Sequence, residues 1–490
     1  MKTYTNPYAA GTANSSLFRI PSVITLKSGR ILAGADIRYG NGTDDPANIE
    51  TAVRYSDDNG KTWSEPCFVN HFDDMEDEDY NVAIPTSASF IDSALVQDES
   101  GRIYHACDAC PAYMGLWSAG TYGKGSGYID GKLVLCALTS PDKAESTTLD
   151  KAHYPYYIDS FGEDNMAPVR KFADNEIFES YYVDRDYCLY KAENGTYSPV
   201  VIKQMKKDGV LSDKDIKANV FYAYSPLKLY PTYYLWIKTS DDNGETWSYG
   251  KIINTEIGSR GFTGFSPGRG LSVNMNGTNR VIFTIYDNND RTEYTSVIYT
   301  DNGGETWNRS KKANKVGLAG KSSESQMVLL HNNTIRMFSR NIAGYIGYCD
   351  STDFGESWGK YTLDKALSYC SNCQFSIINY SKEIDGKSAV IISYPAEKIR
   401  KRGVIKVGTF DEGNRITWSY SKKITTTLKP FTYIYSCITE LPDGRIFDLY
   451  ESDKAALSTE VFEIKELMVK EKTALSFTEK ISSRIKNLKK

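Results

Sequence analysis

Short apolar segments separated by polar turns run along most of this chain. Residues 280–286 (RVIFTIY) and 389–394 (AVIISY) are rich in β-branched and aromatic side chains, a composition typical of β-strands. Residues 460–464 (EVFEI) form a further strand candidate close to the C-terminal end, and helical periodicity is weak throughout. The hydrophobic pattern therefore predicts an all-β protein built from many short strands.

An eight-residue turn recurs between these strand candidates. Two copies are almost identical, at residues 56–63 (SDDNGKTW) and 240–247 (SDDNGETW), and looser copies lie at residues 300–307, 351–358 and 411–418. Asn and Gly tolerate left-handed backbone, and an Asp side chain can accept hydrogen bonds from the amides ahead of it. The tryptophan that closes each copy can pack between sheets. This repetition predicts one hairpin turn in each structural repeat.

The spacing of the closing tryptophans gives the length of the repeat. They follow one another at intervals of 60, 51 and 60 residues, from Trp247 through Trp307 and Trp358 to Trp418. A repeat of this length fits a four-stranded propeller blade. The interval before Trp247 is 184 residues long, about three periods, and the turn is absent from residues 112–228. We expect residues 112–228 to form an inserted, partly β domain within an early blade.

Length and charge exclude several classes of protein. A chain of 490 residues can bury a large core, and 36 tyrosines suit both strands and a sugar-facing surface. The net charge of −4 provides no global field for nucleic acid, so an anionic ligand needs a local basic pocket. No apolar run approaches the ~20 residues of a membrane span, and the N-terminus lacks the apolar core of a signal peptide. We expect either a cytoplasmic protein or a trimmed secreted one.

Cysteine and histidine usage argues against a metal or redox site. Nine cysteines, an odd number in a long chain, do not look like a disulfide scaffold. Two CxxC pairs could together bind zinc through four thiolates, Cys107/Cys110 and Cys370/Cys373. Zinc ribbons pair such motifs at short range, whereas these lie far apart, so we expect buried free thiols. With only four histidines, we expect no catalytic metal and no cofactor.

Residues 18–21 (FRIP) complete a pattern that resembles the sialidase family. This motif precedes the repeated turns, which resemble the Asp boxes of sialidases. Further segments resemble bacterial sialidases, some of which are intramolecular trans-sialidases: residues 324–327 (ESQM), 338–341 (FSRN), 435–438 (YSCI) and 449–451 (LYE). The resemblance covers nearly the whole chain and implies a six-bladed β-propeller. We expect this propeller over residues 1–470, followed by a basic tail at residues 471–490.

Three arginines are candidates for binding an acidic sugar. Sialic acid carries a carboxylate on its anomeric carbon, and the guanidinium fork pairs with a carboxylate bidentately while keeping its charge. The resemblance implies three such arginines, which in this sequence are Arg19, Arg340 and Arg400. Arg402 lies two residues after Arg400 and remains an alternative to it.

Tyr435 is the candidate nucleophile. Most retaining glycosidases attack with a carboxylate, and sialidases are the tyrosine exception. A phenol is neutral before it reacts and so avoids repulsion at a carbon that already bears a carboxylate. With a reference pKa of about 10, it needs a base. The resemblance implies that Glu324 is this base, and Tyr433 is the competing tyrosine, with packing in a blade core as its other role.

A leaving-group acid is expected on a flexible loop that follows Arg38. Residues 39–43 contain two glycines and lead to Asp44 and Asp45. The resemblance implies Asp44 as the acid, with Asp45 as the alternative, and implies that Arg38 orients the acid or contacts ring hydroxyls. Asp92 interrupts an apolar strand, where an unpaired charge is costly. It resembles the family's pocket aspartate that faces the N-acetyl or O4 side of the sugar.

Together these expectations describe a retaining exo-sialidase that releases terminal sialic acid through a covalent sialyl-tyrosine. An intramolecular trans-sialidase, in which the sugar's own glycerol hydroxyl replaces water and gives a 2,7-anhydro product, would use the same residues. A propeller that binds glycans without cleaving them is the alternative from another class, and the complete residue set argues against it. We expect a monomer that acts on sialylated glycoproteins, glycolipids or oligosaccharides, with no nucleic-acid partner and no membrane span.

Overall fold

β-Strands make up nearly all of the regular structure in the computed structural model. It describes residues 5–78, 82–115, 125–259, 261–289, 292–313, 322–424, 432–452 and 456–470, and the tail expected at residues 471–490 lies outside them. The helices of this part of the chain are all short: η1 (Thr12–Asn14), η2 (His331–Asn333) and α1 (Ile464–Leu467). None of them has the length and apolar character that crossing a bilayer requires. The prediction of an all-β fold is confirmed.

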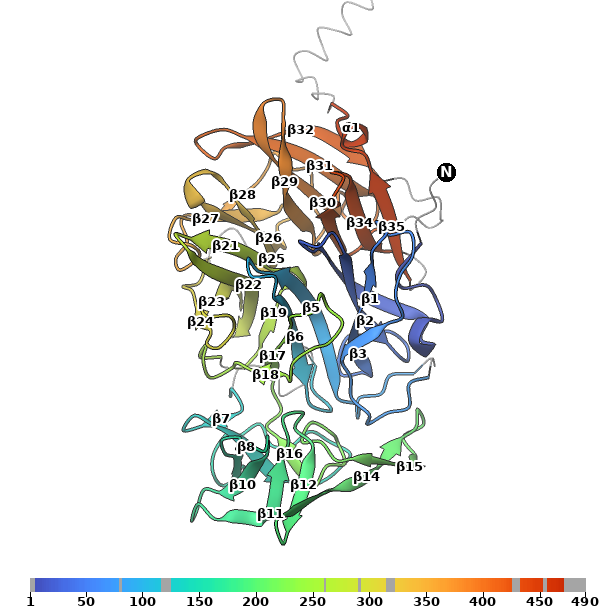
Figure 1. Ribbon diagram of the computed structural model, residues 1–490, viewed down its shortest axis with the longest axis vertical. Coiled ribbons are helices and arrows are strands. Elements are labelled where there is room, and N and C mark those ends of the chain that lie inside the picture. The colour runs from blue at the N-terminus through green and yellow to red at the C-terminus, as the bar shows by residue number, and fades with distance from the viewer. Residues whose placement is uncertain are drawn as a thin grey trace, which may run out of the picture.

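The first sheet joins two antiparallel groups of strands (Figure 1). Its order within the described residues is β1-β2-β3-β5-β6-β17-β18, with β4 beside β3 and β20 beside β5. The two groups meet where β3 and β5 pair in parallel at Ile49 and Ser89. The strands are β1 (Leu17–Thr25), β2 (Ile31–Arg38), β3 (Ile49–Ser56), β4 (Cys67–Asn70), β5 (Ser89–Gln97), β6 (Ile103–Cys110), β17 (Tyr234–Ser240), β18 (Lys251–Ile252) and β20 (Gly268–Arg269).

The chain between β6 and β17 forms a separate sheet at one end of the molecule, teal and green at the bottom of Figure 1. β6 and β17 pair antiparallel from Ala109 and Tyr234 to Ile103 and Ser240, so the chain returns to the strand that it left. The separate sheet has β7 (Tyr128–Ile129), β8 (Lys132–Ala137), β9 (Tyr156–Ile158), β10 (Ala167–Lys171), β11 (Ile177–Val183), β12 (Leu189–Glu193), β13 (Thr196–Pro199) and β16 (Leu227–Leu229). A hairpin beside it consists of β14 (Val201–Met205) and β15 (Leu211–Lys217).

The later strands form further antiparallel sheets that follow one another along the chain. The first contains β19 (Thr263–Phe265), β21 (Leu271–Met275), β22 (Thr278–Asn289), β23 (Thr292–Thr300) and β24 (Asn308–Arg309). The next two contain β25 (Ser322–Leu329), β26 (Ile335–Asn341), β27 (Gly347–Ser351) and β28 (Thr362–Leu363), then β29 (Ser376–Ile384), β30 (Lys387–Pro395), β31 (Gly403–Phe410) and β32 (Ile416–Lys423). The last contains β33 (Ser436–Glu440), β34 (Ile446–Glu451) and β35 (Leu457–Phe462), so the strand expected at residues 460–464 ends two residues earlier.

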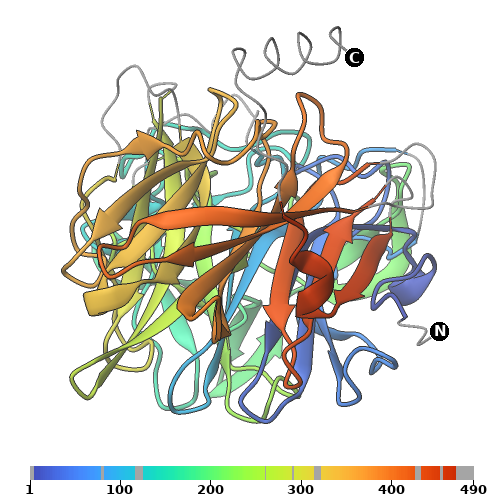
Figure 2. The same ribbon diagram turned by 90° about the horizontal axis from the view of Figure 1, so that it is seen from above.

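The first sheet and the four later sheets surround a common centre in a propeller-like arrangement (Figures 1 and 2). The first and last sheets close the arrangement, because β1 contacts both β33 and β34. One hydrophobic cluster crosses the closure and joins Val23 and Ile37 to Cys437, Phe447 and Leu449. Burying these side chains between neighbouring sheets holds the N-terminal and C-terminal parts of the chain together.

The repeated turn has the same hydrogen bonds in its four clearest copies. In the first copy, the Thr62 backbone N–H donates to Asp58 Oδ1 at 2.9 Å and the Thr62 hydroxyl donates to Oδ2 at 2.8 Å. Equivalent backbone bonds reach Asp242, Asn302 and Asp353 in the other copies. The side chain at this position thus replaces a strand partner for the backbone that leaves the turn. The predicted turn is confirmed in these copies.

Tryptophans that close the turns pack against rings from neighbouring sheets. The Trp63 ring lies 5.9 Å from the ring of Phe447 in β34. Trp307 is 2% exposed, and its ring lies 6.3 Å from that of Tyr104 in β6. Each of these two turns therefore ties its own sheet to another one, as the sequence predicted.

All nine cysteines are free thiols, and seven of them are buried. Cys67 and Cys188 are the half-buried exceptions. Cys107 and Cys110 lie in β6, an inner strand of the first sheet between β5 and β17. Cys370 and Cys373 precede β29. The expectation of free rather than disulfide-bonded cysteines is confirmed.

Candidate active site

One cavity of about 270 Å³ collects residues from strands and loops throughout the propeller-like part of the chain. Seven of the eight site candidates line it, and Arg38 lies outside the lining. Since the first and last of the seven, Arg19 and Tyr435, are far apart in sequence, only the closure of the sheets brings them together. The lining residues are Arg19, Ile20, Asp44, Asp45, Ile91, Asp92, Tyr233, Phe262, Tyr286, Glu324, Arg340, Arg400 and Tyr435.

Three of these side chains lie at or beside β-bulges that direct them toward the cavity. The pairing register of β1 with β2 shifts after Arg19, that of β5 with β6 shifts around Asp92, and that of β25 with β26 shifts around Glu324. Ile20 and Asp92 adopt positive φ angles of 54° and 65° at the first two bulges. A bulge interrupts the alternation of side chains and can redirect one of them. Here the bulged residues, or their neighbours, face a single cavity.

Tyr435 and Glu324 form a hydrogen-bonded pair in the cavity. The Tyr435 hydroxyl donates to Glu324 Oε1 and accepts from Arg340 Nη1 at 2.9 Å, and Arg340 Nη1 also contacts Glu324 Oε2 at 2.6 Å. Burial and the Glu324 charge raise the pKa of Tyr435 well above its usual value of 10.0, although Arg340 and Arg400 oppose the shift. The phenol is therefore protonated at neutral pH, with a carboxylate in place to take its proton.

Three guanidinium groups surround Tyr435. Arg340 bonds to its hydroxyl, and the Cζ atoms of Arg19 and Arg400 lie 5.6 and 5.5 Å from its ring centre. Asn372 fixes two of these groups, since its Oδ1 accepts from Arg340 Nε at 2.8 Å and its backbone oxygen accepts from Arg400 Nη2 at 3.0 Å. Among the described residues, Arg400 has no carboxylate partner. The cavity can therefore accept an anion at this guanidinium without breaking an ion pair.

Two alternatives from the sequence lie away from the cavity. Arg402 Nη1 pairs with Glu397 at 2.9 Å on an exposed part of the loop after β30. The Tyr433 hydroxyl is buried and donates to Asp448 Oδ2 at 3.0 Å. Arg400 rather than Arg402, and Tyr435 rather than Tyr433, therefore line the cavity.

Asp44 lies between two arginines. Its Oδ1 contacts Arg19 Nη1 at 2.9 Å and Arg38 Nη1 at 2.6 Å. Burial acts to raise the pKa of Asp44, but Arg38 and Arg19 outweigh it and hold the pKa below its usual value. Arg38 is fully buried behind Asp44, and its Nη2 also pairs with Asp36 at 2.9 Å. Arg38 is thus positioned to orient Asp44 and does not reach into the cavity.

Asp45, the alternative acid, is bonded to groups in the wall of the cavity. Its Oδ2 accepts hydrogen bonds from the Tyr233 hydroxyl and from Cys110 Sγ, the latter at 3.3 Å. Burial raises the pKa of Asp45 to about 6. The Asp44 side chain is 53% exposed, and its ion pairs with described residues are to Arg19 and Arg38, so it is the more accessible of the two carboxyl groups.

Asp92 presents a carboxyl group to the cavity without a hydrogen-bond partner among the described residues. Burial and the charges of Asp36 and Glu324 raise its pKa well above the usual value. The raised pKa favours the neutral carboxyl group, which can donate a hydrogen bond to a ligand and costs less to bury than a charged one.

Sequence reasoning gave no role to Glu451 and overlooked the aromatic wall. Glu451 Oε1 accepts from Arg19 Nε at 3.1 Å and from the Ile20 backbone N–H at 2.9 Å, so it holds the first arginine in place. The sequence signal was its place at the end of residues 449–451 (LYE), one of the segments that resemble bacterial sialidases. Phe262 packs its ring 4.7 Å from that of Tyr233 and 5.2 Å from that of Tyr286, and these rings form an apolar side of the cavity.

The cavity combines a phenol and its base with a cation cluster and a second, accessible carboxylate. The guanidinium groups suit a carboxylate ligand, the phenol–carboxylate pair can attack an electrophilic carbon, and Asp44 can exchange a proton with a leaving group. Fold and site together define the class of Asp-box, propeller-like proteins with a pocket suited to a carboxylate ligand.

Comparison with known proteins agrees with this class. The family model described as BNR repeat-like domain matches residues 202–447, and the BNR/Asp-box repeat matches residues 54–65. The structure of an intramolecular trans-sialidase from Ruminococcus gnavus in complex with oseltamivir carboxylate is similar with a TM-score of 0.82 and 32% identity, over 96% of this chain and 99% of that one. The chain belongs to the sialidase family.

Two curated relatives match over most of this chain. The anhydrosialidase of Macrobdella decora is 31% identical over 96% of this chain and 62% of its own length. Sialidase B of Streptococcus pneumoniae is 34% identical over 90% of this chain and 63% of its own length. The chain thus spans less than two thirds of either relative. The structure of the leech intramolecular trans-sialidase with 2,7-anhydro-Neu5Ac has a TM-score of 0.82 at 29% identity.

Proposed function

We propose that this protein is a retaining exo-sialidase that releases terminal sialic acid from sialylated glycoproteins, glycolipids or oligosaccharides. The observation that carries the proposal is the hydrogen-bonded pair of Tyr435 and Glu324 beside the guanidinium groups of Arg19, Arg340 and Arg400. A phenol paired with a base suits attack on a carbon that already bears a carboxylate, and the cations suit that carboxylate. The names of the relatives support the same chemistry.

We further propose a six-bladed propeller over residues 1–470, with residues 112–228 as an inserted domain and the protein as a monomer. Strands β1–β4 would form one blade, and β5, β6, β17 and β18 the next. The later sheets would supply the remaining four. The return of the chain from β6 to its partner β17 supports an insertion at this point. A crystal structure tests the blade count, and light scattering tests the monomer.

Substrate binding would change the partners of Asp44. The sugar carboxylate would pair with Arg340, Arg400 and Arg19, and it would compete with Asp44 for the last of these. Loss of one cation raises the pKa of a carboxyl group, so Asp44 could then hold the proton that an acid must donate. Arg38 would keep Asp44 oriented throughout this exchange.

The first chemical step would form a covalent sialyl-enzyme. The Tyr435 oxygen attacks the anomeric carbon while Glu324 takes the phenol proton. As this bond forms, the bond from the anomeric carbon to the glycosidic oxygen breaks, and that oxygen keeps the electron pair and takes a proton from Asp44. Asp92, which faces the cavity and whose raised pKa favours the neutral form, would donate a hydrogen bond to the N-acetyl or O4 side of the sugar.

The second step would release the sugar with retained configuration. Asp44, now a base, takes a proton from water, whose oxygen attacks the anomeric carbon, and the Tyr435 oxygen leaves and recovers its proton from Glu324. A second candidate function replaces water with the sugar's own glycerol hydroxyl and yields 2,7-anhydro-sialic acid. The specific observation that favours this candidate is the similarity to relatives described as intramolecular trans-sialidases.

An activity assay with matched variants tests the proposal. Wild-type protein should release the fluorophore from an aryl sialoside, and Tyr435→Phe should reduce kcat by at least about 10³-fold because the nucleophile is lost. Tyr433→Phe is the control, because Tyr433 lies outside the cavity and bonds to Asp448. Sialoside binding without turnover by wild type would instead indicate a glycan-binding propeller.

Product analysis separates the two candidate functions. With 3′-sialyllactose as substrate, NMR distinguishes free sialic acid from the 2,7-anhydro sugar. Free sialic acid as the first product supports hydrolysis, and the anhydro sugar supports intramolecular transfer. Near-normal turnover by Tyr435→Phe would remove the assigned nucleophile under either outcome.

A further inference from the structure

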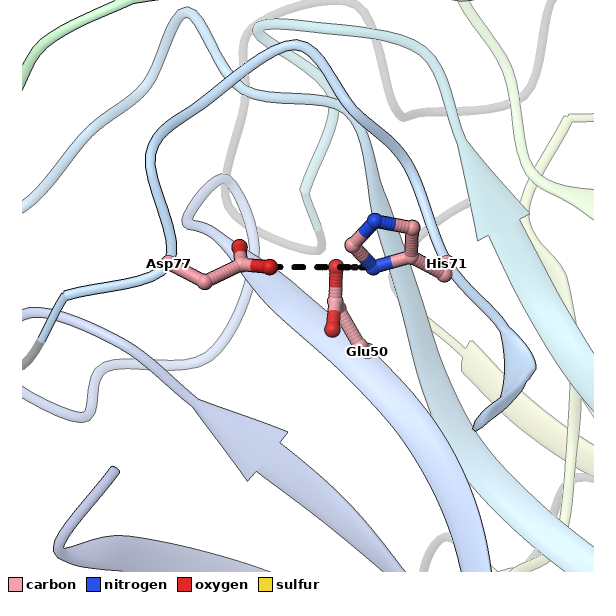
Figure 3. A group of neighbouring side chains, drawn as sticks. All are labelled: Glu50, His71 and Asp77. Atoms are coloured by element: carbon pink, nitrogen blue, oxygen red, sulfur yellow. Dashed lines mark ion pairs between the residues drawn. The ribbon is translucent and has the colours of Figure 1, made fainter. Parts of the chain in front are cut away.

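Glu50, His71 and Asp77 bring three potential metal ligands together outside the active-site cavity (Figure 3). One ligand atom from each of the three lies within 4.8 Å of the others. Glu50 belongs to β3, His71 follows β4, and Asp77 comes from the loop that continues after it. His71 Nδ1 forms an ion pair with Glu50 Oε1 and lies 3.9 Å from Asp77 Oδ2. Figure 3 shows the three polar groups pointing toward one another.

Buried polar atoms in this cluster lack hydrogen bonds. Glu50 is fully buried, and its Oε2 has no partner among the described residues. The same holds for Oδ1 of Asp77 and for both side-chain amide atoms of Asn48, a residue that is 1% exposed. The Asn48 amide faces the Asp77 carboxyl without reaching hydrogen-bond geometry. Buried carboxylates and amides are normally paired or coordinate a metal, so these atoms are available as ligands for an ion.

The orientation of His71 provides independent support. Its Nε2 is 3.0 Å from Asp73 Oδ1, on the side of the ring opposite the cluster. Once an ion displaces the proton that Nδ1 shares with Glu50, the hydrogen bond from Nε2 to Asp73 keeps the lone pair of Nδ1 directed at Glu50 and Asp77. Metal-binding histidines commonly donate their second ring N–H to a carboxylate in this way. The His71 side chain is 33% exposed, so an ion has access from solvent.

We propose that Glu50, His71 and Asp77 bind a divalent transition-metal ion, with Zn²⁺ as the expected occupant and Asn48 within reach as a further ligand. Imidazole nitrogen suits zinc, and carboxylate oxygens complete such sites, whereas calcium and magnesium favour oxygen alone. Ligand atoms about 2.0–2.2 Å from one ion lie about 3.3–3.6 Å apart in tetrahedral geometry, so His71 and Asp77, 3.9 Å apart, would close by a few tenths of an ångström. Glu50 would move back from His71 to admit the ion.

The ion would stabilise the base of the loop that carries Asp44. The Tyr39 backbone N–H donates to the Asn48 backbone oxygen at 3.1 Å and closes this loop, and Glu50 lies two residues further on. On the other side, the loop that contains Asp77 bonds to the hairpin of β14 and β15, where Met205 N–H donates to the Asp74 oxygen at 2.9 Å. A metal at this point links β3 to that loop. Its role is structural, because none of its ligands lines the active-site cavity.

Metal titration of the whole, tag-free chain tests this site. After treatment with a chelator and dialysis, calorimetry and elemental analysis should find one Zn²⁺ per chain and an increase in Tm on adding Zn²⁺. Asp77→Asn should weaken Zn²⁺ binding by more than about 100-fold, because it removes a charged ligand from a half-buried loop position. Asp73→Ala should weaken binding by about 10–100-fold through loss of the bond that orients His71.

His153→Gln is the matched control. His153 Nδ1 pairs with Asp150 at 2.8 Å, but the described residues offer no third ligand there, so Zn²⁺ binding should be unchanged. The Tm of metal-free Asp77→Asn should stay close to that of metal-free wild type and should no longer rise with Zn²⁺. The proposal is overturned if wild type binds no Zn²⁺, if it binds Ca²⁺ in preference, or if Asp77→Asn and His153→Gln alter binding equally.

Discussion

At the scale of single residues, Asp44 has two competing requirements. Arg19 and Arg38 hold its pKa low, which suits a carboxylate, whereas protonating a leaving group requires a raised pKa. The sugar carboxylate is proposed to pair with Arg19 in place of Asp44. Substrate binding would therefore itself raise the pKa of Asp44. Burial has the opposite effect on the neighbouring Asp45: it raises the pKa of this carboxyl group, which accepts a hydrogen bond from the Tyr233 hydroxyl.

Asp44→Asn should reduce turnover in a way that depends on the leaving group. An amide cannot donate a proton as an acid does, so kcat for 3′-sialyllactose should fall by about 10²–10⁴-fold. An aryl sialoside with an acidic phenol as leaving group needs less protonation and should lose less. Steady-state kinetics with both substrates measures the difference, and Asp45→Asn serves as the control that keeps Asp44. Equal losses with the two substrates would argue against the acid role.

Asp45→Asn should change how stability depends on pH. Burial raises the pKa of folded Asp45 to about 6 from 3.8, so its contribution to stability is present below about pH 4 and is lost as the pH rises through about 6. Asparagine does not titrate, and the variant should therefore gain about 2–3 kcal/mol relative to wild type between pH 4 and pH 7. Urea unfolding at several pH values measures this difference. A constant difference across that range would contradict the raised pKa.

At the scale of elements, the turns and the bulges have separate tasks. The Asp-box turns use one side chain to hold the backbone that leaves each hairpin, and their hydrogen bonds are local. The bulges in β1, β5 and β25 interrupt strand pairing and direct Arg19, Asp92 and Glu324 at the cavity. Repetition of the turn stabilises the architecture, and the departures from regular pairing build the site.

Asp242→Ala should destabilise the protein more than Asp242→Asn. Alanine removes the acceptor for the Thr246 backbone N–H at 2.9 Å and for the Ser240 hydroxyl at 2.7 Å, which should cost about 1–3 kcal/mol. Asparagine should cost less, because Asn302 already occupies this position in the third turn and donates from Nδ2 to the Thr306 hydroxyl at 2.9 Å. Urea denaturation of both variants measures the order, and the reverse order would contradict this account of the turn.

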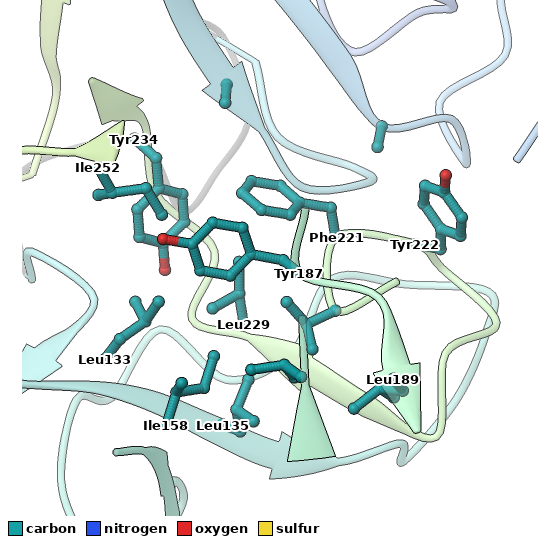
Figure 4. Packing of buried hydrophobic residues seen from close by; sticks show 14 of the residues in the cluster. Leu133, Leu135, Ile158, Tyr187, Leu189, Phe221, Tyr222, Leu229, Tyr234 and Ile252 are labelled. Carbon is teal, nitrogen blue, oxygen red and sulfur yellow. The ribbon is translucent and has the colours of Figure 1, made fainter. Parts of the chain in front are cut away.

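At the scale of the whole molecule, the separate sheet and the propeller-like part share one hydrophobic cluster (Figure 4). It includes Leu133 and Ile158 from the separate sheet together with Phe90 and Trp236 from the first sheet. Phe221 belongs to the same cluster, and its ring lies 5.3 Å from that of Phe72. Figure 4 shows Phe221 beside Tyr187 and Tyr234 within this cluster. Because the cluster spans both parts, neither can unfold without exposing apolar surface on the other.

Calorimetry should therefore find one cooperative unfolding transition for the two parts. Phe221→Ala removes a buried ring from the shared cluster and should cost about 3–5 kcal/mol, which lowers the Tm of that single transition. Phe178→Ala is the control, since Phe178 is half-buried in β11 and packs on Tyr156 at a ring distance of 3.9 Å, and it should cost less. Two separate transitions in wild type, with only one sensitive to Phe221→Ala, would show independent units.

Local chemistry explains what could be predicted from the sequence. The Asp-box turns are recognisable because Asp58 and its equivalents bond only to residues a few positions ahead, so the whole interaction lies in one stretch of sequence. The strand-rich composition predicts the all-β fold for the same reason. The candidates Arg19, Glu324, Arg340 and Tyr435 came from short motifs that resemble a family, and the structure brings these four together in one cavity.

Interactions between distant segments decided the rest. Neither spacing nor composition could choose Arg400 over Arg402, because the choice depends on which side chain reaches Asn372 and which reaches Glu397. Glu451 holds Arg19 only after the last sheet closes against the first. The cluster of Glu50, His71 and Asp77 likewise exists only once the loops pack. The sequence by itself determined the strands, the turns and the kinds of side chain, because these depend on neighbours along the chain. Only the tertiary structure decided which of those side chains meet, because hydrogen bonds and ion pairs require contact in space.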